Sequence, residues 1–347
     1  MPLQDLRVRA ADPRTERDRI LPVLRRNLSA AGAVERFNWL YLENPHGLAR
    51  LWVAETAHGE IVGTSAAHPK RAWIDGDLHD VLDLSDFALD PRYRSAGPGL
   101  RLLRATLAGI ADDDVALSYD HPSPAMLALH LRLGGRDVSA RRRWTRLLEV
   151  SGDLGKRFGA AARTVGRLGD LALRGRDALA RRSTRAVTPL HGPCGEEFDR
   201  LDRETRTRTR FRVQRSAAAL RWRFQRYPIA RHEVLCARDG GHLCGYVVFR
   251  PRADRVLAIV DLLTNDDDRW TAPLIDAVVQ LGHQRRQRAV WVTVLRDSPI
   301  EAHLARNHFT PRAEEPGLVI TASKLAGLAA ELRRPQQWWM LEGDEDV

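Results

Sequence analysis

Two blocks of sequence occur twice in this chain, and this repetition constrains the fold more than any other feature. WLYLENP (39–45) matches WRFQRYP (222–228) in its tryptophan, in the aromatic residue two positions later and in its proline. In both copies a strand, a tight turn and a second strand then lead to a glycine, Gly63 in the first copy and Gly245 in the second. The matching order predicts a tandem duplication.

A third block repeats in the same order, in 115–135 and 290–309. Each copy reads as a strand, a Ser-Pro pair suited to the start of a helix, and a helix. The 347 residues are enough for two domains with separate cores. We therefore expect an N-terminal domain over 1–149, a linker over 150–186 and a C-terminal domain over 187–347.

The order of elements in each copy predicts an α/β (α+β) domain built on a mixed, mostly antiparallel twisted sheet flanked by helices. In the first copy we expect strands and helices near 51–56, 60–73, 79–89, 99–110, 115–119 and 124–133, followed by a strand pair to about 149.

The linker is rich in glycine and arginine, and its apolar residues recur at loose helical intervals. One interpretation is a partly helical segment that lies on the protein. The alternative is a basic amphipathic surface over 152–185 that makes peripheral contact with an anionic membrane.

The charge and the cysteines exclude several classes of protein. The formal net charge of +10 comes almost entirely from arginine, and no nucleic-acid-binding motif is present, so we expect no specific nucleic-acid partner. Cys194, Cys236 and Cys244 lack metal-ligand spacing, and we expect no metal. Their small odd number and the absence of a signal-like or membrane-spanning apolar run predict a cytoplasmic protein.

The stretch RYRSAGPGLRLLRATL (92–107) places Gly97 and Gly99 between an apolar strand and a helix. Glycines before a helix leave backbone N–H groups exposed, which is what phosphate binding requires. The alternative is a tight turn with Pro98 in the first helical turn.

Arg94-x-x-Gly97-x-Gly99 matches the R/Q-x-x-G-x-G/A loop of the GNAT superfamily of N-acetyltransferases, and the helix in 123–138 resembles a later helix of that family. FNWLYLENPHG and WWMLEGDEDV resemble bacterial tandem members, several of which lie among surface-polysaccharide genes. The resemblance covers most of both halves.

The resemblance implies that acetyl-CoA is the acyl donor. The backbone of Phe87, Ala88 and Leu89 would pair with pantetheine. The pyrophosphate would lie against Arg94, Ser95, Ala96, Gly97, Gly99 and Leu100. Pro98 departs from the pattern because it has no N–H to donate.

The same resemblance suggests two catalytic residues. Asp86, favoured over Asp83, would be the base, with anchoring of the loop as its alternative role. His130 stands where the family usually has a tyrosine acid and would protonate the sulfur; the alternative is a surface histidine. Tyr119 is a second candidate donor.

The second copy lacks these features. Its segment 264–279 has no glycine, and Asp266, Asp267 and Asp268 would repel a pyrophosphate, so we expect a degenerate domain that closes an acceptor pocket between the copies. The paired aromatic residues of the first repeat are expected in the core.

These observations predict an acyl-CoA-dependent N-acyltransferase, most simply an N-acetyltransferase, that transfers acetyl directly to a small-molecule amine or amino sugar. One alternative is a non-catalytic binding or scaffold protein in surface-polysaccharide assembly. Another is an aminoacyl-transferring relative that uses charged tRNA. The sequence leaves the oligomeric state open.

Overall fold

The computed structural model describes residues 6–28, 32–94, 96–111, 115–179, 186–323 and 331–345. Within these ranges, no helix has both the length and the apolar character needed to cross a bilayer.

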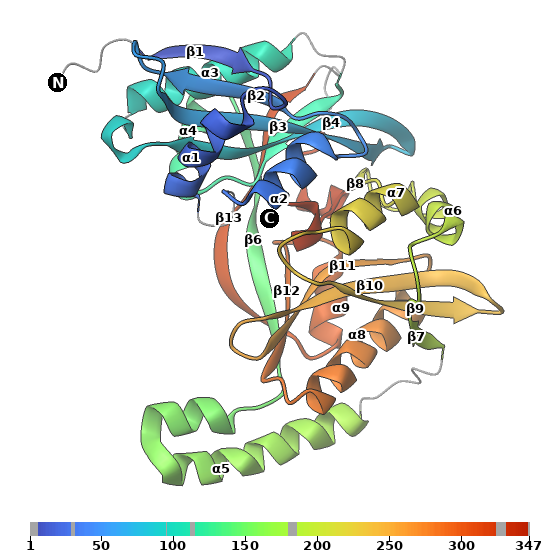
Figure 1. Cartoon of the computed structure of the whole chain (residues 1–347). Helices are drawn as coiled ribbons and strands as arrows, with labels where there is room; N and C mark the ends of the chain where they lie inside the picture. Colours follow the sequence, from blue (N-terminus) through green and yellow to red (C-terminus); the bar gives the residue numbers. More distant parts are fainter. Residues whose placement is uncertain are drawn as a thin grey trace.

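A mixed sheet of fourteen strands forms the centre of the molecule (Figure 1). The first half contributes β1 (Arg7–Ala11), β2 (Arg50–Glu55), β3 (Ile61–Ile74), β4 (Asp77–Leu89), β5 (Leu117–Asp120) and β6 (Arg136–Leu147). The second contributes β7 (Val187–Pro189), β8 (Phe211–Val213), β9 (Glu233–Asp239), β10 (His242–Arg252), β11 (Val256–Thr264), β12 (Ala289–Leu295), β13 (Thr310–Ser323) and β14 (Trp338–Trp339). Most strand pairs are antiparallel, while β4–β5, β11–β12 and β8–β14 are parallel. The predicted mixed, mostly antiparallel α/β class is confirmed.

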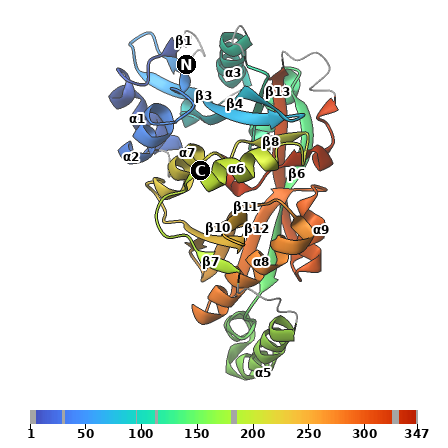
Figure 2. The ribbon, with the colours of Figure 1, turned by 90° about the vertical axis from the view of Figure 1, so that its right-hand side faces the viewer.

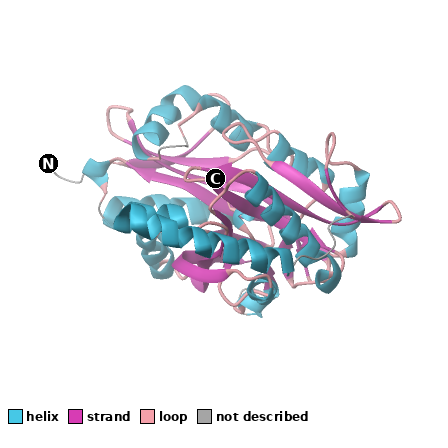
Figure 3. Cartoon of the chain, turned by 90° about the horizontal axis from the view of Figure 1, so that it is seen from below, coloured by secondary structure: helices cyan, strands magenta, loops and turns pink. Residues whose placement is uncertain are grey.

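Helices cover both faces of the sheet (Figure 3). The α-helices are α1 (Arg17–Asn27), α2 (Val34–Phe37), α3 (Ala96–Ala111), α4 (Pro124–Arg132), α5 (Ser151–Leu179), α6 (Glu196–Glu204), α7 (Ala217–Leu220), α8 (Asp267–Gln284) and α9 (Ile300–Arg306). Short π-helices η1 (Asn38–Leu42) and η3 (Arg221–Gln225) follow α2 and α7, and 3-10 turns lie at η2 (Pro91–Tyr93), η4 (Pro335–Gln337) and η5 (Glu342–Asp344). In the first half, α1 and α2 pack on one face of the sheet and α3 on the other (Figure 2), and α4 packs on the same core as α3.

The two halves exchange their last strands. β6 belongs to the first half in sequence, yet residues 141–147 pair with β12 of the second half. In return, β13 lies between β5 and β6. The strand pair expected up to residue 149 is therefore wrong: the structure has one strand there, and its partners come from the other half of the chain.

The repeated motifs meet where the halves join. Trp39 and Trp222 stack with ring centroids 4.6 Å apart. Each indole N–H donates to the backbone carbonyl of the other tryptophan, at 2.8 and 2.9 Å. Gly63 and Gly245 also occupy equivalent places, because a Cβ at either would lie within 2.7 Å of the facing strand, at Leu89 or Thr264. The aromatic residues are core residues, as the sequence predicts.

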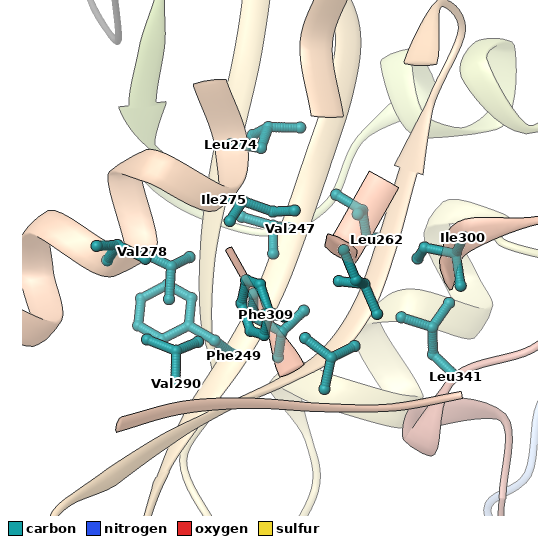
Figure 4. Packing of buried hydrophobic residues seen from close by; sticks show 14 of the residues in the cluster. Val247, Phe249, Leu262, Leu274, Ile275, Val278, Val290, Ile300, Phe309 and Leu341 are labelled. Carbon is teal, nitrogen blue, oxygen red and sulfur yellow. The ribbon is translucent and has the colours of Figure 1, made fainter. Parts of the chain in front are cut away.

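The second half has a large hydrophobic core between its sheet and α8 (Figure 4). Leu274, Ile275 and Val278 of α8 pack against Val247 and Phe249 of β10, and these five side chains are at least 99% buried. Apolar residues at i, i+1 and i+4 place one face of α8 on the sheet.

Candidate functional site

The site expected from the sequence lies where β4 and β5 separate. The parallel pairing runs from Val81–Leu117 to Leu84–Asp120 and ends there, while β4 continues to Leu89. The Asp90 N–H donates to the Val62 carbonyl in β3 at 2.8 Å. Because backbone groups alternate along a strand, the polar groups of Leu89 and Phe87 turn to the edge that β5 has left. That edge can accept another extended chain.

A cavity of about 440 Å³ opens beside this edge. Its lining includes five of the residues predicted to contact the donor: Phe87, Ala88, Leu89, Arg94 and Gly99. The fold thus brings together the strand end and the glycine turn, as the sequence predicts.

The glycine turn forms the start of α3, which begins at Ala96. Gly97 is exposed, and a side chain there would meet nothing within 4 Å. A Cβ at Gly99 would lie 3.4 Å from Leu129 and 3.9 Å from Phe87, so the absence of a side chain helps keep the cavity open. Leu100 follows on α3 and is half-buried, while Ser95 lies outside the described residues.

Pro98 lies in the first turn of α3, where N–H groups have no partner inside the helix. Its missing N–H therefore breaks no helical hydrogen bond. The turn still has its other amides, and it carries no acidic residue. With the positive end of the helix dipole, this end of α3 suits an anion.

Arg94 links the turn to the end of β4. Its Nε donates to the Leu89 carbonyl at 2.8 Å, and an Nη donates to Asn27 of α1 at 2.8 Å. Both contacts place the guanidinium at the cavity, where its charge favours an anionic ligand.

Sequence reasoning missed part of the cavity wall: Asn27, Leu28, Ser123, Ala125, Met126 and Leu129. Ser123 was identified as a helix cap, and its hydroxyl accepts from the Met126 N–H at 3.4 Å. The Ser-Pro signal thus located α4 but not its place at the site. Asn27 and Leu28 carry no local signal, because only the packing of α1 brings them there.

Asp86 lies on a β-bulge, with φ +48°, where Asp86 and Phe87 together face one residue of β3. Arg36 donates to both carboxylate oxygens at 2.8 and 3.1 Å, and the Tyr41 hydroxyl donates at 2.8 Å. Burial raises the pKa of Asp86, but the charge and hydrogen bonds of Arg36 outweigh burial and leave the pKa below its usual value. These contacts favour the anchoring role, and catalysis by Asp86 stays a prediction.

His130 is fully buried on α4 instead of lying on the surface. Its Nε2 lies 2.6 Å from a carboxylate oxygen of Asp120, the last residue of β5. The pair fastens α4 to the point where the strands separate. The role of His130 as an acid also stays a prediction, since the ring does not line the cavity.

A buried polar cluster lies at the same separation point. Lys70 donates to Asp83 at 2.5 Å, and His121, the first residue after β5, has its Nδ1 3.9 Å from the other Asp83 oxygen. Burial and the nearby charge of Lys70 hold the pKa of His121 well below its usual value, so the imidazole is neutral near pH 7. Burial likewise raises the pKa of Tyr119 well above its usual value, which keeps the phenol protonated. Sequence reasoning missed His121.

Two spaces lie near the join between the halves. The first, lined by Lys70, Arg215 and Asp344 among others, has about 40 Å³, roughly the room of one water molecule. The second has about 280 Å³ and is lined by Arg141 and Glu345, which form an ion pair. The second space is the larger of the two, and the charge of Arg141 helps to lower the pKa of His121.

The corresponding junction in the second half is closed. α8 begins after β11, and the Asp266 carboxylate accepts from the Arg269 N–H at 3.2 Å. Trp270, the fourth residue of α8, is buried in the core, whereas the fourth residue of α3 is Gly99. An indole thus fills the position that glycine leaves open in the first half.

The cysteines lie in the second half, and all three are free and buried. Burial raises the pKa of Cys194 to about 12 and that of Cys236 to about 11. These two thiols are therefore protonated near neutral pH and are poor nucleophiles. In the described part of the chain, no group of three or more His, Cys, Asp and Glu side chains is arranged to hold a metal.

Solved structures resemble this arrangement over nearly the whole chain. A GCN5-related N-acetyltransferase from Anabaena variabilis aligns with a TM-score of 0.64 at 15% identity, over 90% of this chain and 72% of that one. The chain has the fold of the GCN5-related N-acetyltransferases. A second protein with this GNAT fold, from Kribbella flavida, has a TM-score of 0.61 at 19% identity, over 91% of this chain and 70% of that one.

The GNAT fold here also resembles an N-myristoyltransferase from Saccharomyces cerevisiae with bound myristoyl-CoA. The TM-score is 0.58 at 14% identity, over 92% of this chain and 79% of that one. No family model matches the chain, and no curated protein matches it. At these identities the comparisons establish the fold, and the resemblance to the GNAT superfamily is confirmed at that level.

Proposed function

We propose that the chain is an acyl-CoA-dependent N-acyltransferase, most simply an N-acetyltransferase with acetyl-CoA as donor. The observation that carries this proposal is the cavity at the separation of β4 and β5, which joins the part of β4 that β5 does not pair with, at Phe87 and Leu89, to the glycine turn at Gly99. Pantetheine contains two amides that can pair with a strand edge, and its pyrophosphate suits the start of a helix. The fold neighbours are named as N-acetyltransferases and an N-myristoyltransferase, which supports this class of reaction.

In the proposed arrangement, Phe87, Ala88 and Leu89 align the pantetheine arm. The turn from Arg94 to Leu100 holds the pyrophosphate through backbone N–H groups and the Arg94 charge. Pro98 removes one donor from this set. The same proposal includes a tandem organisation, with domains over 1–149 and 187–347, which is supported by the equivalent places of Trp39 and Trp222. It also includes a cytoplasmic location.

In the proposed reaction the acceptor amine, once deprotonated, attacks the thioester carbonyl. The C–N bond forms, the C–S bond breaks, and the thiolate of CoA takes a proton. We assign to His121 the acceptance of a hydrogen bond from the acceptor amine, because its imidazole is neutral near pH 7 and lies at the separation point. The burial and the Lys70 charge that lower its pKa make it a poor final acceptor of the proton, which passes from the amine nitrogen to the thiolate. Asp86 and His130 remain the candidates predicted from sequence, but their observed contacts suit positioning of β4 and α4.

We propose that the acceptor, a small-molecule amine or amino sugar, approaches through the 280 Å³ space beside Arg141 and Glu345. Arg141 of this space acts electrostatically on His121, and the 440 Å³ cavity lies beside the glycine turn. Donor and acceptor would therefore enter by separate openings and meet where β4 and β5 part.

The test is calorimetric titration of acetyl-CoA into the wild-type protein and the Gly97→Asp and Gly97→Asn variants. Gly97 is exposed with no heavy atom within 4 Å of an added Cβ, so both side chains fit. The aspartate would place a negative charge against the pyrophosphate, while asparagine has the same size without the charge. We expect micromolar binding to the wild type and at least about a tenfold loss in Gly97→Asp alone.

Equal binding by the aspartate and asparagine variants would contradict the assignment of the glycine turn to pyrophosphate. No binding to the wild type would contradict the enzyme proposal and favour the scaffold alternative. If binding is found, release of CoA thiol across a panel of amines and amino sugars identifies the acceptor. The membrane contact expected over 152–185 depends on α5 and not on this site.

A further inference from the structure

The helical segment α5 projects from the end of the molecule opposite α3 and α4 (Figure 1). It consists of two helices joined at Gly159, where φ is +83°. The segment therefore folds as a helical hairpin, whereas the sequence predicted only a partly helical linker. Residues 180–185 of that linker lie outside the described residues.

The inner face of the second helix is bonded both to the start of the hairpin and to the body of the protein. The Asp170 carboxylate accepts from the N–H groups of Val150 and Ser151 at 2.6 and 3.1 Å. Asp177 pairs with Arg146 at 3.0 Å and with His283 at 2.9 Å, and it is almost fully buried. These contacts fix which face of the helix is turned outward.

The outer face carries a stripe of large apolar side chains. Val165, Leu168 and Leu171 are 66%, 68% and 62% exposed, and they follow a spacing of three residues that keeps them on one side of a helix. Leu179 continues the stripe, and Phe158, 70% exposed, lies at the bend. Elsewhere in the described residues, large apolar side chains are exposed only at Leu78, Leu131 and Ile229, by 37–49%.

Basic side chains run beside this stripe. Arg163, Arg167 and Arg174 are exposed and share one flank, because they recur at four and seven residues. Asp170 and Asp177 lie on the same side of the helix as these arginines, but they accept hydrogen bonds from Val150, Ser151 and Arg146. The charged side chains that are described as exposed on α5 are all basic. An outward apolar stripe with a basic flank is the pattern of a helix that lies in the headgroup region of a membrane.

We propose that α5 docks the protein on an anionic lipid bilayer. Its arginines would lie among the headgroups, and its apolar side chains would reach the acyl chains next to them, through Phe158, Val165, Leu168 and Leu171. The charge argues for this occupant. A second copy of the chain would bring two arginine rows together, whereas anionic headgroups neutralise them. The donor cavity at α3 and α4 stays away from the membrane in this orientation (Figure 1).

The experiment is co-sedimentation of the full chain with vesicles of phosphatidylcholine, with and without phosphatidylglycerol. We expect binding that needs phosphatidylglycerol and weakens as salt is raised. Leu168→Asp tests the stripe and should weaken binding at least about tenfold. The triple Arg163→Gln, Arg167→Gln, Arg174→Gln variant tests the flank. At about fivefold for each arginine, it should weaken binding by about a hundredfold.

Two matched controls separate docking from the overall basic charge. Ile229→Asp adds the same acid at an exposed apolar site outside α5. The triple Arg14→Gln, Arg132→Gln, Arg312→Gln variant removes the same charge from exposed sites elsewhere. Both controls should bind vesicles like the wild type. Equal weakening by the two arginine triples would show general electrostatic adsorption and overturn the proposal.

Absence of wild-type binding to phosphatidylglycerol vesicles would also overturn it. So would a wild-type dimer in light scattering that Leu168→Asp converts to a monomer, because the stripe would then be a protein interface. Titration of acetyl-CoA into each variant keeps this question separate from the proposed reaction. Loss of vesicle binding with unchanged acetyl-CoA binding concerns α5 alone.

Discussion

In the first half, the helix after β4 begins with Ala-Gly-Pro-Gly, whereas the helix after β11 in the second half begins with aspartates and a tryptophan. Both helices follow a strand that separates from a parallel neighbour. Gly99 borders a cavity in one half, and Trp270 packs into the core at the same helical position in the other. The residue after the parallel neighbour also differs: His121 follows β5 and Arg296 follows β12.

The difference shows that the same arrangement of strand and helix can either border a cavity or pack into a core. An open junction needs a residue without a side chain at the fourth helical position and no acid in the first turn. A closed junction gains buried apolar area from an indole, which stabilises the core. The framework alone therefore does not determine whether a half binds a ligand.

The largest expected effect on ligand binding comes from giving the first half the residue of the second. Gly99→Trp would fill the cavity beside Phe87 and Leu129, so we expect acetyl-CoA affinity to fall at least about a hundredfold. Calorimetric titration measures the loss. Arg104→Trp, on the exposed side of α3, is the control and should bind like the wild type. Retained affinity in Gly99→Trp would show that the donor binds elsewhere.

The second comparison concerns the residue that follows the parallel neighbour. His121→Ala removes the neutral imidazole that orients the acceptor amine, and we expect turnover to fall by up to about 10²-fold while acetyl-CoA affinity is unchanged. Added imidazole should restore part of the rate, since it can occupy the vacated space. The pKa of His121 lies well below its usual value, so wild-type turnover should show no loss centred near pH 6.5 as the pH falls. If His121→Ala loses turnover and added imidazole does not restore it, His121 has a structural role.

The smallest expected effect is a difference in stability between variants of the two buried arginine–aspartate pairs. Asp86→Asn removes the carboxylate charge that faces Arg36, at a cost of about 3–5 kcal/mol in the free energy of unfolding. Asp261→Asn should cost less, because Arg215 also bonds Asp344 at 2.7 Å. Urea unfolding measures both, with Asp80→Asn at an exposed pair as the control. Equal costs for the two buried variants would show that Asp344 gives Arg215 no support.

Much of the fold could be predicted because the signals are local. The repeated order of strand, tight turn and strand located β2 and β3, and Ser123 with Pro124 located the start of α4. The partners of β6 could not be predicted, because strand pairing across more than 150 residues leaves no local signal. The same limit explains why Asn27 and Leu28 were missed at the cavity.

The site residues divide in the same way. The glycine turn was predicted because its residues are contiguous. Asp86 and His130 were placed near the separation of β4 and β5, but their partners Arg36 and Asp120 became evident only from packing. Whether a carboxylate is free or paired depends on charges that the chain brings from distant positions, and so does its pKa.

The sequence by itself determined the repeat, the α/β class and the exposed start of α3, since each depends on residues that are neighbours in the chain. The tertiary structure alone decided that the halves share one sheet through exchange of β6 and β13, that Trp270 closes the second junction, and that the apolar stripe of α5 faces outward. Each of these depends on which distant side chains meet, because burial and pairing are properties of the folded chain and not of a local segment.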